Sequence, residues 1–437
     1  MEQAPRIVSI LKIFTQQRKN LQYTEHMFIE RPDLMNHLDK YRDRDLVKVL
    51  TGVRRCGKST LLMEFARRLV ESGVPQQNVF IRRLDEFQYL FDYSARDLHQ
   101  EISHAMAGKA EGPFYVFLDE VQEVDGWERI VRGLEATDGV DVYITGSNAY
   151  LLSSELATLL TGRYISIHVQ PLSFVEVATH FQSSTPSHSL EELFLGYMRH
   201  GGMPAIYEQG APDGTTWAET LTDIYESVVN RDIAARSQIR DKAALGRLCQ
   251  YLFSTSGSLV NATKVANALK QSNASISRNT VEQWMETMSD AFLLYAAPQE
   301  RLRGKALLNP NRKWYPVDNG FRNLATGNPA SDRGAQLEGI VFMELIRRGY
   351  AVTVGDLGEP RDSGSEIDFV ARLGTKQLYI QVTLDMLDDR VRTRELKPLQ
   401  ALTDAHERLV LTLNRLDTGM TEEGIRIEYI PEWLMNR

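Results

Sequence analysis

The chain has 437 residues, of which 43% are hydrophobic and 25% are charged, and its formal net charge at pH 7 is −8. This balance is typical of a globular protein of about three domains, and its acidity excludes a protein that coats nucleic acid with its whole surface. No apolar run reaches the ~18 residues of a membrane span, no signal-peptide cleavage site is present, and two cysteines cannot form a disulfide framework. We therefore expect a cytoplasmic protein that does not associate with membranes.

Residues 1–44 are predicted to form a helical lead-in to the first strand. The stretch 52–60 then reads G-x-x-x-x-G-K-[ST], the pattern of the phosphate-binding loop (P-loop) of nucleotide triphosphatases. An apolar run suited to a buried strand, 46–50, precedes this loop, and an amphipathic helical segment, 61–70, follows it. Strand, glycine-rich loop and helix in this order are the context that such a loop requires.

The P-loop predicts a site for ATP and Mg²⁺. Gly52 and Gly57 allow the backbone to turn so that several N–H groups converge on one phosphate, and the helix N-terminus adds a partial positive charge. Lys58 is expected to reach the β- and γ-phosphates, and the hydroxyl of Ser59 is expected to bind Mg²⁺. The predicted nucleotide-binding residues are Gly52, Val53, Arg54, Arg55, Cys56, Gly57, Lys58, Ser59 and Thr60.

A second hydrophobic strand, 114–118, leads directly into Asp119 and Glu120. A buried strand that ends in solvated acids would look the same, but its position downstream of a complete P-loop favours the Walker B pattern of the same ATPases. We predict that Asp119 binds Mg²⁺ and that Glu120 is the general base for the water that attacks the γ-phosphate.

The buried strand 140–147 leads to Asn148, our candidate for the polar residue that contacts the γ-phosphate or the attacking water, with Thr145 and Ser147 as alternatives. Strands and helices alternate as far as residue 180, which favours an α/β fold with a parallel sheet and helices on both faces. The nucleotide is then expected at the carboxyl ends of the strands.

Residues 181–240 are predicted to be mainly helical, with a break at the sequence GGMP (201–204), and to form a lid over the nucleotide. An arginine that faces the γ-phosphate would stabilise negative charge in the transition state. Arg163, Arg231 and Arg236 are the candidates, and an ordinary salt bridge is the alternative for each of them.

Residues 241–325 have the element order of a winged helix-turn-helix, with short helices followed by a basic hairpin. Between residues 240 and 318, 11 Lys and Arg stand against 6 Asp and Glu, a local net charge of +5 within an acidic protein. A basic hairpin can bind phosphates, whereas Glu282 and Glu286, close to Arg278 on the presumed recognition helix, would repel a duplex. DNA is therefore one candidate partner, and packing against neighbouring domains is the alternative.

The last unit, 326–437, has the spacing of a PD-(D/E)XK nuclease core. A helix glutamate (Glu338), a strand aspartate (Asp368) and Gln381 stand where that core carries its metal ligands. The lysine of the motif is replaced by Thr383, and Gln381 offers an oxygen without charge, so we expect weak metal binding. A degenerate domain with a structural or nucleic-acid-docking role is favoured over active cleavage.

The complete pattern resembles prokaryotic AAA-type P-loop ATPases with a C-terminal PD-(D/E)XK nuclease-like domain of unknown function. The matching stretches follow one another along nearly the whole chain: TGVRRCGKSTLL, YVFLDEVQEV, ITGSNAYLLSSELATLLTGR, PLSFVEV, GGMP, VNRDI, WYPVDNG, LEGIVFMELIRRGY, EIDFVA and YIQV. The resemblance implies ATP binding and hydrolysis through Lys58, Ser59, Asp119 and Glu120, and it implies no settled cellular role.

We therefore expect an ATPase that acts as a nucleotide-driven switch or motor on a nucleic-acid or protein partner, and that is able to form oligomers. The alternatives are an ATP-gated DNA nuclease and a non-catalytic scaffold that ATP stabilises. The expected units are the helical lead-in (1–44), a P-loop ATPase core (45–180), a helical lid (181–240), a winged helix (241–325) and a restriction-endonuclease-like α/β domain (326–437).

Overall fold

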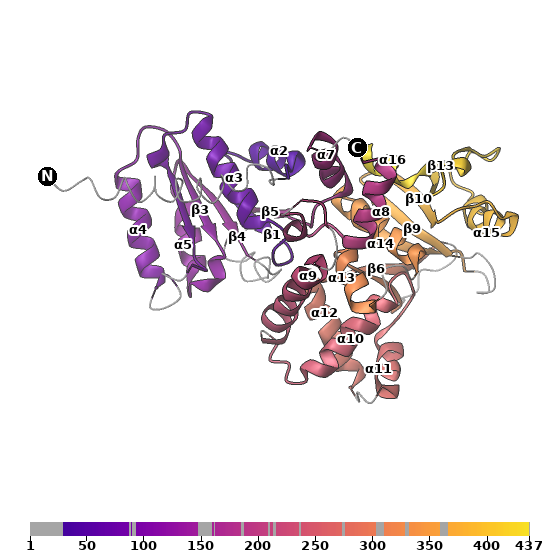
Figure 1. Ribbon diagram of the computed structural model, residues 1–437. Helices are drawn as coiled ribbons and strands as arrows, with labels where there is room; N and C mark the ends of the chain where they lie inside the picture. Colours follow the sequence, from indigo (N-terminus) through magenta and orange to yellow (C-terminus); the bar gives the residue numbers. More distant parts are fainter. Residues whose placement is uncertain are drawn as a thin grey trace.

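Figure 1 shows the computed structural model of the chain, with an N-terminal α/β domain at one end and a second sheet at the other. A group of helices lies beside the junction of these two parts. The structure describes residues 29–86, 89, 93–146, 160, 162–184, 188–208, 210–212, 216–235, 237–272, 276–302, 310–327, 332–358 and 366–436.

The N-terminal domain is built on a parallel sheet, as predicted. Among the described residues this sheet has five strands in the order β2-β3-β4-β1-β5, and every neighbouring pair is parallel. The strands are β1 (Val47–Thr51), β2 (Val79–Arg83), β3 (Phe114–Asp119), β4 (Val140–Thr145) and β5 (Tyr164–His168). The helices are α2 (Pro32–Lys40), α3 (Lys58–Glu71), α4 (Ala95–Ala107) and α5 (Trp127–Glu135), with short 3₁₀ turns at Gln76–Asn78 and Val121–Glu123.

Alternating side chains of β3 show why helices cover both faces of this sheet. Tyr115 and Phe117 belong to one hydrophobic cluster together with Phe65 of α3, whereas Val116 belongs to another together with Leu98 of α4. Successive residues of a strand point to opposite faces, so a strand that is apolar throughout needs a packed layer on each side. Figure 1 accordingly shows α3 on one side of the sheet and α4 and α5 on the other.

The chain after β5 is mainly helical, as predicted, until the second sheet begins. The predicted break near 201–204 is present, because α8 ends at His200 and a short 3₁₀ helix follows at Pro204–Tyr207. The helices are α7 (Phe174–Ser184), α8 (Leu190–His200), α9 (Thr216–Ser227), a π-helix (Val228–Ala235), α10 (Lys242–Ser254), α11 (Ala262–Gln271) and α12 (Arg278–Asp290).

The second sheet contains both the predicted hairpin and the strands of the last unit. In the described part of the chain its order is β12-β13-β11-β10-β9-β8-β6-β7. Its β6–β7 hairpin is antiparallel, and β6 pairs in parallel with β8, so the hairpin is continuous with the C-terminal strands. The elements are β6 (Leu294–Arg301), β7 (Arg312–Pro316), α13 (Asn319–Thr326), α14 (Arg333–Arg347), β8 (Ala351–Asp356), β9 (Glu366–Leu373), β10 (Lys376–Thr383), α15 (Asp389–Gln400), β11 (Glu407–Thr412), a 3₁₀ turn (Arg415–Asp417), β12 (Gly419–Met420), β13 (Arg426–Tyr429) and α16 (Ile430–Met435).

One hydrophobic cluster connects the two ends of the molecule. It includes Leu62 of α3, Leu252 of α10, Phe342 of α14 and Leu411 of β11. Since protein interiors are close-packed, a shift at one end of such a cluster is felt at the other. No helix in the described part of the chain has the length and apolarity that crossing a bilayer requires.

Three loops meet where the N-terminal domain joins the second half. The Gly202 N–H donates to Asp318 Oδ2 (2.6 Å), and the Leu172 N–H donates to Gly202 O (2.7 Å). A Cβ atom on Gly202 would lie 2.1 Å from Leu172 O, and one on Gly201, whose φ is +81°, would lie 1.8 Å from Asp318 Oδ1. The motifs PLSF, GGMP and VDNG are therefore parts of one tightly packed junction.

We predict that Gly202→Ala destabilises the protein, because the added methyl group must displace the Leu172 carbonyl. The expected loss is about 1–3 kcal/mol of unfolding free energy, the usual cost of overpacking a well-filled site. Thermal unfolding followed by circular dichroism measures this loss as a lower midpoint.

Gly196→Ala is the matched control, since Gly196 lies within α8 with no atom within 4 Å of its added Cβ. This variant should unfold at or above the wild-type temperature, because alanine favours a helix over glycine by up to about 1 kcal/mol. Equal midpoints for Gly202→Ala and Gly196→Ala would contradict the packing described for the junction.

Candidate nucleotide-binding site

The P-loop lies between the end of β1 and the first turn of α3. Gly52 has φ +149°, and a Cβ atom there would lie 2.0 Å from Val169 O, so only glycine fits at this position. Gly57 has φ +100° and precedes Lys58, the first residue of α3. Lys58 is 4% exposed, and its Nζ donates to Gly52 O (3.0 Å) and Val53 O (3.2 Å). The ammonium group is thus held within the turn of the loop.

The carboxylate of Asp119 joins the P-loop to two strands of the sheet. Ser59 Oγ donates to Asp119 Oδ1 (3.0 Å), and Thr145 Oγ1 donates to the same oxygen (2.5 Å). Asp119 is fully buried, and burial raises its pKa despite these hydrogen bonds. Because β3 and β4 are parallel neighbours, their last residues meet at one edge of the sheet, beside the start of α3.

The donor set at Asp119 fits a magnesium ion. Asp119 Oδ2 is buried and accepts no hydrogen bond from any residue that the structure describes, although Arg83 Nε lies 3.7 Å away. An ionised carboxylate and a serine hydroxyl supply the hard oxygen ligands that Mg²⁺ prefers. Ser59 and Asp119 are therefore suited to hold this ion next to Lys58.

Glu120 has an unusual backbone conformation at the end of β3. Its φ of 53° lies in the left-handed region, which non-glycine residues seldom adopt and which is concentrated at functional sites. The Glu120 N–H donates to Thr145 Oγ1 (3.0 Å), and Gln122 donates a hydrogen bond to the Glu120 carboxylate. Thr145 thus contacts both carboxylate residues of the strand end.

A buried ion pair connects the P-loop with the helical region. Arg54 Nε and Nη2 donate to the two carboxylate oxygens of Asp232 (2.9 and 3.0 Å), and Asp232 is 2% exposed. Hydrogen bonding to Asp232 raises the pKa of Arg54, and the negative charge of Glu120 adds to this effect. Asp232 was not identified from sequence, because an aspartate within a helical segment has no distinguishing pattern.

A second connection involves a histidine at the end of β5. His168 Nε2 lies 2.5 Å from the hydroxyl of Tyr295 on β6, and its Nδ1 lies 3.5 Å from Thr51 Oγ1, directly before the P-loop. Burial lowers the pKa of His168 to about 4, so the ring is neutral at pH 7. His168 therefore links the P-loop strand to the second sheet by packing and hydrogen bonding rather than by charge.

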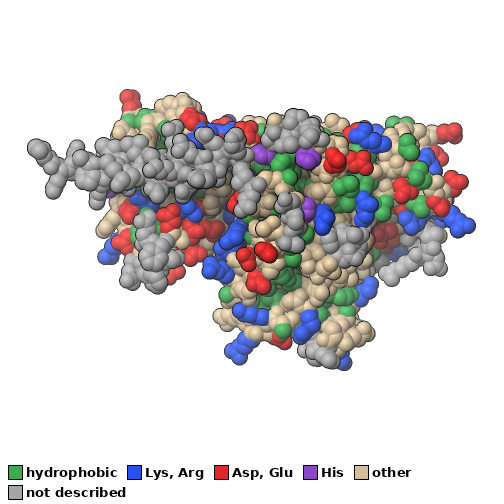
Figure 2. All heavy atoms as spheres, viewed as in Figure 1, with side chains coloured by type: hydrophobic (Ala, Val, Ile, Leu, Met, Phe, Trp, Pro, Cys, Tyr) green, Lys and Arg blue, Asp and Glu red, His purple; other side chains and the backbone are tan. Residues whose placement is uncertain are grey.

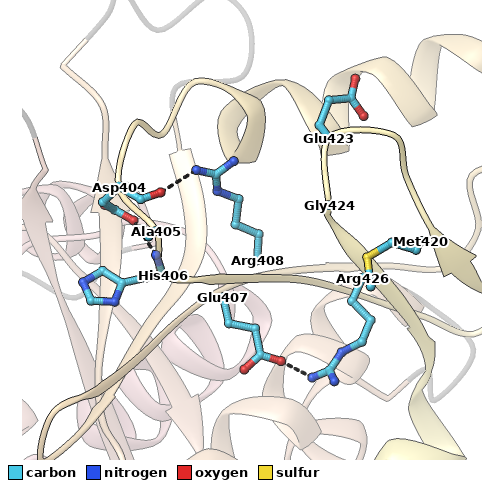
Figure 3. Close-up of a pocket in the computed structure, with 9 residues that line it drawn as sticks. All are labelled: Asp404, Ala405, His406, Glu407, Arg408, Met420, Glu423, Gly424 and Arg426. Atoms are coloured by element: carbon cyan, nitrogen blue, oxygen red, sulfur yellow. Dashed lines mark hydrogen bonds and ion pairs between the residues drawn. The ribbon is translucent and has the colours of Figure 1, made fainter.

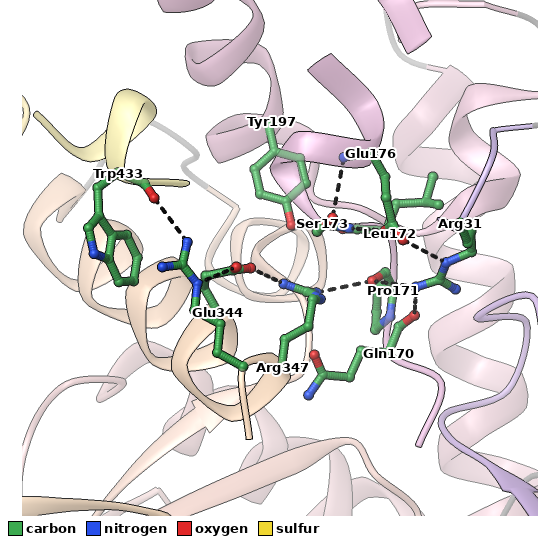
Figure 4. A network of polar contacts seen from close by, with 11 residues as sticks. Arg31, Gln170, Pro171, Leu172, Ser173, Glu176, Tyr197, Glu344, Arg347 and Trp433 are labelled. Atoms are coloured by element: carbon green, nitrogen blue, oxygen red, sulfur yellow. Dashed lines mark hydrogen bonds and ion pairs between the residues drawn. The ribbon is translucent and has the colours of Figure 1, made fainter. Parts of the chain in front are cut away.

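A buried arginine of the lead-in, Arg31, also contacts the P-loop. Arg31 donates to Cys56 O (3.1 Å) and Gln170 O (2.8 Å) and pairs with Glu176 (3.2 Å). Figure 4 shows the segment 170–173 lying between Arg31 and Arg347 of α14, which donates to Pro171 O (3.1 Å). The thiol of Cys56 is buried and donates to Val169 O (3.0 Å).

The predicted arginine Arg163 is not placed to serve the P-loop of its own chain. Its carbonyl oxygen accepts from the Val47 N–H, so it lies where β1 and β5 begin, whereas the P-loop follows the end of β1. Its guanidinium is exposed and pairs with Glu135 (3.1 Å). The prediction is wrong for a role within one chain, because parallel strands separate these two edges by the full strand length. Arg231 lies exposed on the π-helix, while Ser147, Asn148 and Arg236 lie outside the described residues.

The predicted residues of the last unit come together around an unpredicted lysine. Lys313 of β7 lies 2.6 Å from Glu338 Oε1 and 3.1 Å from Asp368 Oδ1. Gln381 Oε1 accepts from the Asp368 N–H (2.7 Å). Lys313 was missed because it stands far from the motif in sequence, in a hairpin whose basic residues suggested phosphate binding.

A separate hollow of about 360 Å³ lies at the start of β11 and β13, beside the segments that lead into these two strands. Figure 3 shows that charged side chains line it, and that Arg426 pairs with Glu407 and Arg408 with the backbone of Asp404. None of the predicted site residues contributes to its lining. The hollow is therefore distinct from the candidate nucleotide site.

The chain is similar to known protein families and to two uncharacterised proteins. Residues 44–178 match the AAA domain family, and residues 191–332 match a domain of unknown function, DUF8612. An uncharacterised protein of Haemophilus influenzae is 36% identical over 93% of this chain and 98% of its own length. The uncharacterised protein MJ1544 of Methanocaldococcus jannaschii is 29% identical over 80% of this chain and 77% of its own length.

Among solved structures, a Walker-type ATPase of Pyrococcus abyssi is similar, with 12% identity, a TM-score of 0.46 and coverage of 68% of this chain and 96% of that one. The Orc1 protein of Aeropyrum pernix, solved in complex with DNA, has 11% identity and a TM-score of 0.32 over 69% of this chain and 93% of that one. The chain belongs to the same protein family as the Haemophilus protein, and its residues 44–178 are an AAA-type P-loop ATPase domain.

Proposed function

We propose that this protein binds ATP together with Mg²⁺ and hydrolyses it at the P-loop. The observation that carries the proposal is the buried carboxylate of Asp119, which accepts hydrogen bonds from Ser59 at the start of α3 and from Thr145 at the end of β4. A charged group so far from solvent is costly unless an ionic partner compensates it. A magnesium ion bound with the nucleotide would be that partner.

Each residue of this site has a defined task in the proposed reaction. The loop 52–57 and the N-terminus of α3 bind the phosphates, and Lys58 neutralises their negative charge. Ser59 and Asp119 hold Mg²⁺, which neutralises the charge that develops on the phosphate oxygens. Glu120 accepts the proton of the attacking water, and Thr145 keeps Glu120 oriented through its backbone N–H.

We further propose that the nucleotide acts as a switch for the second half of the chain. Three contacts support this: Arg54 with Asp232, His168 with Tyr295, and Arg31 with Cys56. The first and third contacts join the P-loop to segments outside the first sheet, and the second joins the neighbouring strand β5 to the second sheet. A change in P-loop geometry on binding or hydrolysis would shift the balance of these contacts and so reorient the helices and the second sheet.

The partner that this switch serves is proposed to be a nucleic acid or a protein. Helices α10, α11 and α12 with the β6–β7 hairpin follow the order of a winged helix, which supports DNA as a partner. Arg278 of α12 pairs with Glu282 (3.8 Å), and Figure 2 shows acidic and basic side chains intermixed on the face in view, which favours a protein partner. We also propose that the protein assembles into oligomers and that it is located in the cytoplasm.

The two alternative functions make different demands on the same residues. An ATP-gated nuclease would need Glu338, Asp368 and Gln381 to bind a metal ion, and Lys313 lies between two of these side chains. A scaffold stabilised by ATP would need only the binding residues, with no task for Glu120. The ATPase is preferred because both Asp119 and Glu120 are oriented by Thr145.

The ATPase proposal is tested with two substitutions at the P-loop site. Lys58→Ala should weaken ATP binding by about tenfold or more, because it removes the charge-assisted contacts to the phosphates. Glu120→Gln should retain ATP binding and lose about 100-fold or more in turnover, because it removes only the base. Phosphate release measures turnover, and isothermal titration calorimetry measures binding.

Lys109→Ala and Glu111→Gln serve as matched controls, since both residues are exposed in the turn that precedes β3. Both should bind and hydrolyse ATP as the wild type does. Turnover that Glu120→Gln leaves unchanged would reject the assigned site, and tight binding without turnover in the wild type would favour the scaffold.

Tyr295→Phe tests the connection between the ATPase domain and the second sheet. It removes the hydroxyl that contacts His168 while it keeps the ring, at a cost of about 1 kcal/mol for the hydrogen bond. Addition of a non-hydrolysable ATP analogue should change the hydrogen exchange of residues 294–301 in the wild type. In the variant this change should fall to about half or less, while turnover stays within about threefold of the wild type.

Tyr350→Phe is the matched control, because it loses one hydroxyl from a ring that packs against the same hydrophobic cluster. It should keep the full nucleotide-dependent change in exchange. An unaltered nucleotide effect on residues 294–301 in Tyr295→Phe would show that the His168 contact does not transmit the switch.

A further inference from the structure

Lys313 lies at the centre of the acidic cluster of the second sheet. Its side chain is 2% exposed, and its Nζ lies 2.6 Å from Glu338, 2.8 Å from Glu366 and 3.1 Å from Asp368. The three carboxylates come from α14 and β9, whereas the lysine comes from β7. The ammonium group donates hydrogen bonds to Glu338 and Asp368, and Glu366 adds a third ion pair.

The charge of Lys313 is maintained by this arrangement. The three carboxylates around its Nζ offset the cost of burying its positive charge. A buried ammonium is stable only with such compensation, and the carboxylates in turn need a cation. The cluster and the lysine are therefore electrostatically dependent on each other.

The oxygens that would bind a metal ion are already used by protein groups. Glu338 Oε1 also accepts from the Tyr315 hydroxyl (2.5 Å), and Asp368 Oδ2 accepts from the Val382 N–H (3.0 Å). Gln381 Oε1 accepts from the Asp368 N–H (2.7 Å), so the predicted third ligand points its oxygen at the backbone. In the described part of the chain, no three His, Cys, Asp or Glu side chains are arranged to hold a metal ion.

The second oxygen of Glu338 is covered as well. A Cβ atom on Gly257, in the loop after α10, would lie 2.8 Å from Glu338 Oε2, so the backbone of this loop closes that side of the cluster. The φ of Gly257 is +79°, a conformation that suits glycine. The helical region, the hairpin and the last unit thus all contribute to the cluster, which remains open to solvent at Glu366.

We infer that Lys313 is a tethered cation that occupies the place of a divalent metal ion between Glu338 and Asp368 and closes this cluster to metals. The site then fastens the β6–β7 hairpin to α14 and β9 instead of cleaving phosphodiesters. Removal of the lysine uncovers a latent site for a hard divalent cation with carboxylate ligands. This inference is independent of ATP hydrolysis at the P-loop.

The test replaces Lys313 with methionine and uses Mn²⁺ as the probe, in the absence of nucleotide. The Lys313→Met variant leaves three carboxylates without their cation, so its melting temperature should be lower than that of the wild type. Millimolar Mn²⁺ should raise that temperature by roughly 5 °C, because a ligand that binds only the folded state stabilises it. The wild type should show no such rise.

Two further variants locate the effect. Lys313→Met/Asp368→Asn should lose the Mn²⁺-dependent rise, because it lacks one of the two carboxylates that flank the cation. Lys313→Met/Glu338→Gln should be more stable than Lys313→Met without metal, because it relieves repulsion between like charges, and it keeps the test informative if the single variant does not fold. The same melting temperatures are measured with Asp119→Asn added to each protein, so that Mn²⁺ bound at the P-loop does not contribute to the rise.

Three results would overturn the inference. The first is Mn²⁺ binding by the wild type that Asp368→Asn abolishes, which would make the cluster an open metal site in the presence of Lys313. The second is Mn²⁺-dependent cleavage of DNA by the wild type that Lys313→Met abolishes, which would make the lysine part of a nuclease. The third is a folded Lys313→Met variant that Mn²⁺ does not stabilise.

Discussion

The structure depends on the burial of one carboxylate at the carboxyl edge of the first sheet. Asp119 is fully buried at the end of an apolar strand, and hydroxyl groups from α3 and β4 hold it in place. This arrangement ties the first turn of α3, directly after the P-loop, to the carboxyl edge of the sheet. In the proposed function, a nucleotide with its magnesium ion would compensate this buried carboxylate, so Asp119 matters both for the fold and for the proposed reaction.

Segments from three parts of the chain contact the P-loop or its neighbouring strands. Arg31 of the lead-in contacts the loop directly, and Asp232 of the π-helix binds Arg54 of the loop. Tyr295 of the second sheet contacts His168 of β5, whose ring lies close to Thr51 at the end of β1. A single hydrophobic cluster also connects these parts of the molecule. The second sheet ends in its own closed charge cluster around Lys313, where a protein cation stands in a position that a nuclease would give to a metal ion.

Local motifs made the first half of the fold predictable, and long-range contacts limited the prediction of the rest. The P-loop and the strand that ends at Asp119 carry their chemistry in contiguous residues, so both the parallel sheet and the relation of Ser59 to Asp119 follow from the sequence. Lys313 and Asp232 act through partners far away in the chain, and no local pattern distinguishes them. Arg163 directly precedes a strand of the parallel sheet and therefore lies at the amino edge, whereas the P-loop follows the carboxyl end of β1.

The measurement that tests the account most directly is the effect of Mg²⁺ on ATP affinity in the wild type and in Asp119→Asn. If Asp119 holds the ion, Mg²⁺ should tighten ATP binding to the wild type, and the substitution should reduce that tightening by about tenfold or more. An equal effect of Mg²⁺ on ATP affinity in a folded Asp119→Asn protein would contradict the central role given to this carboxylate.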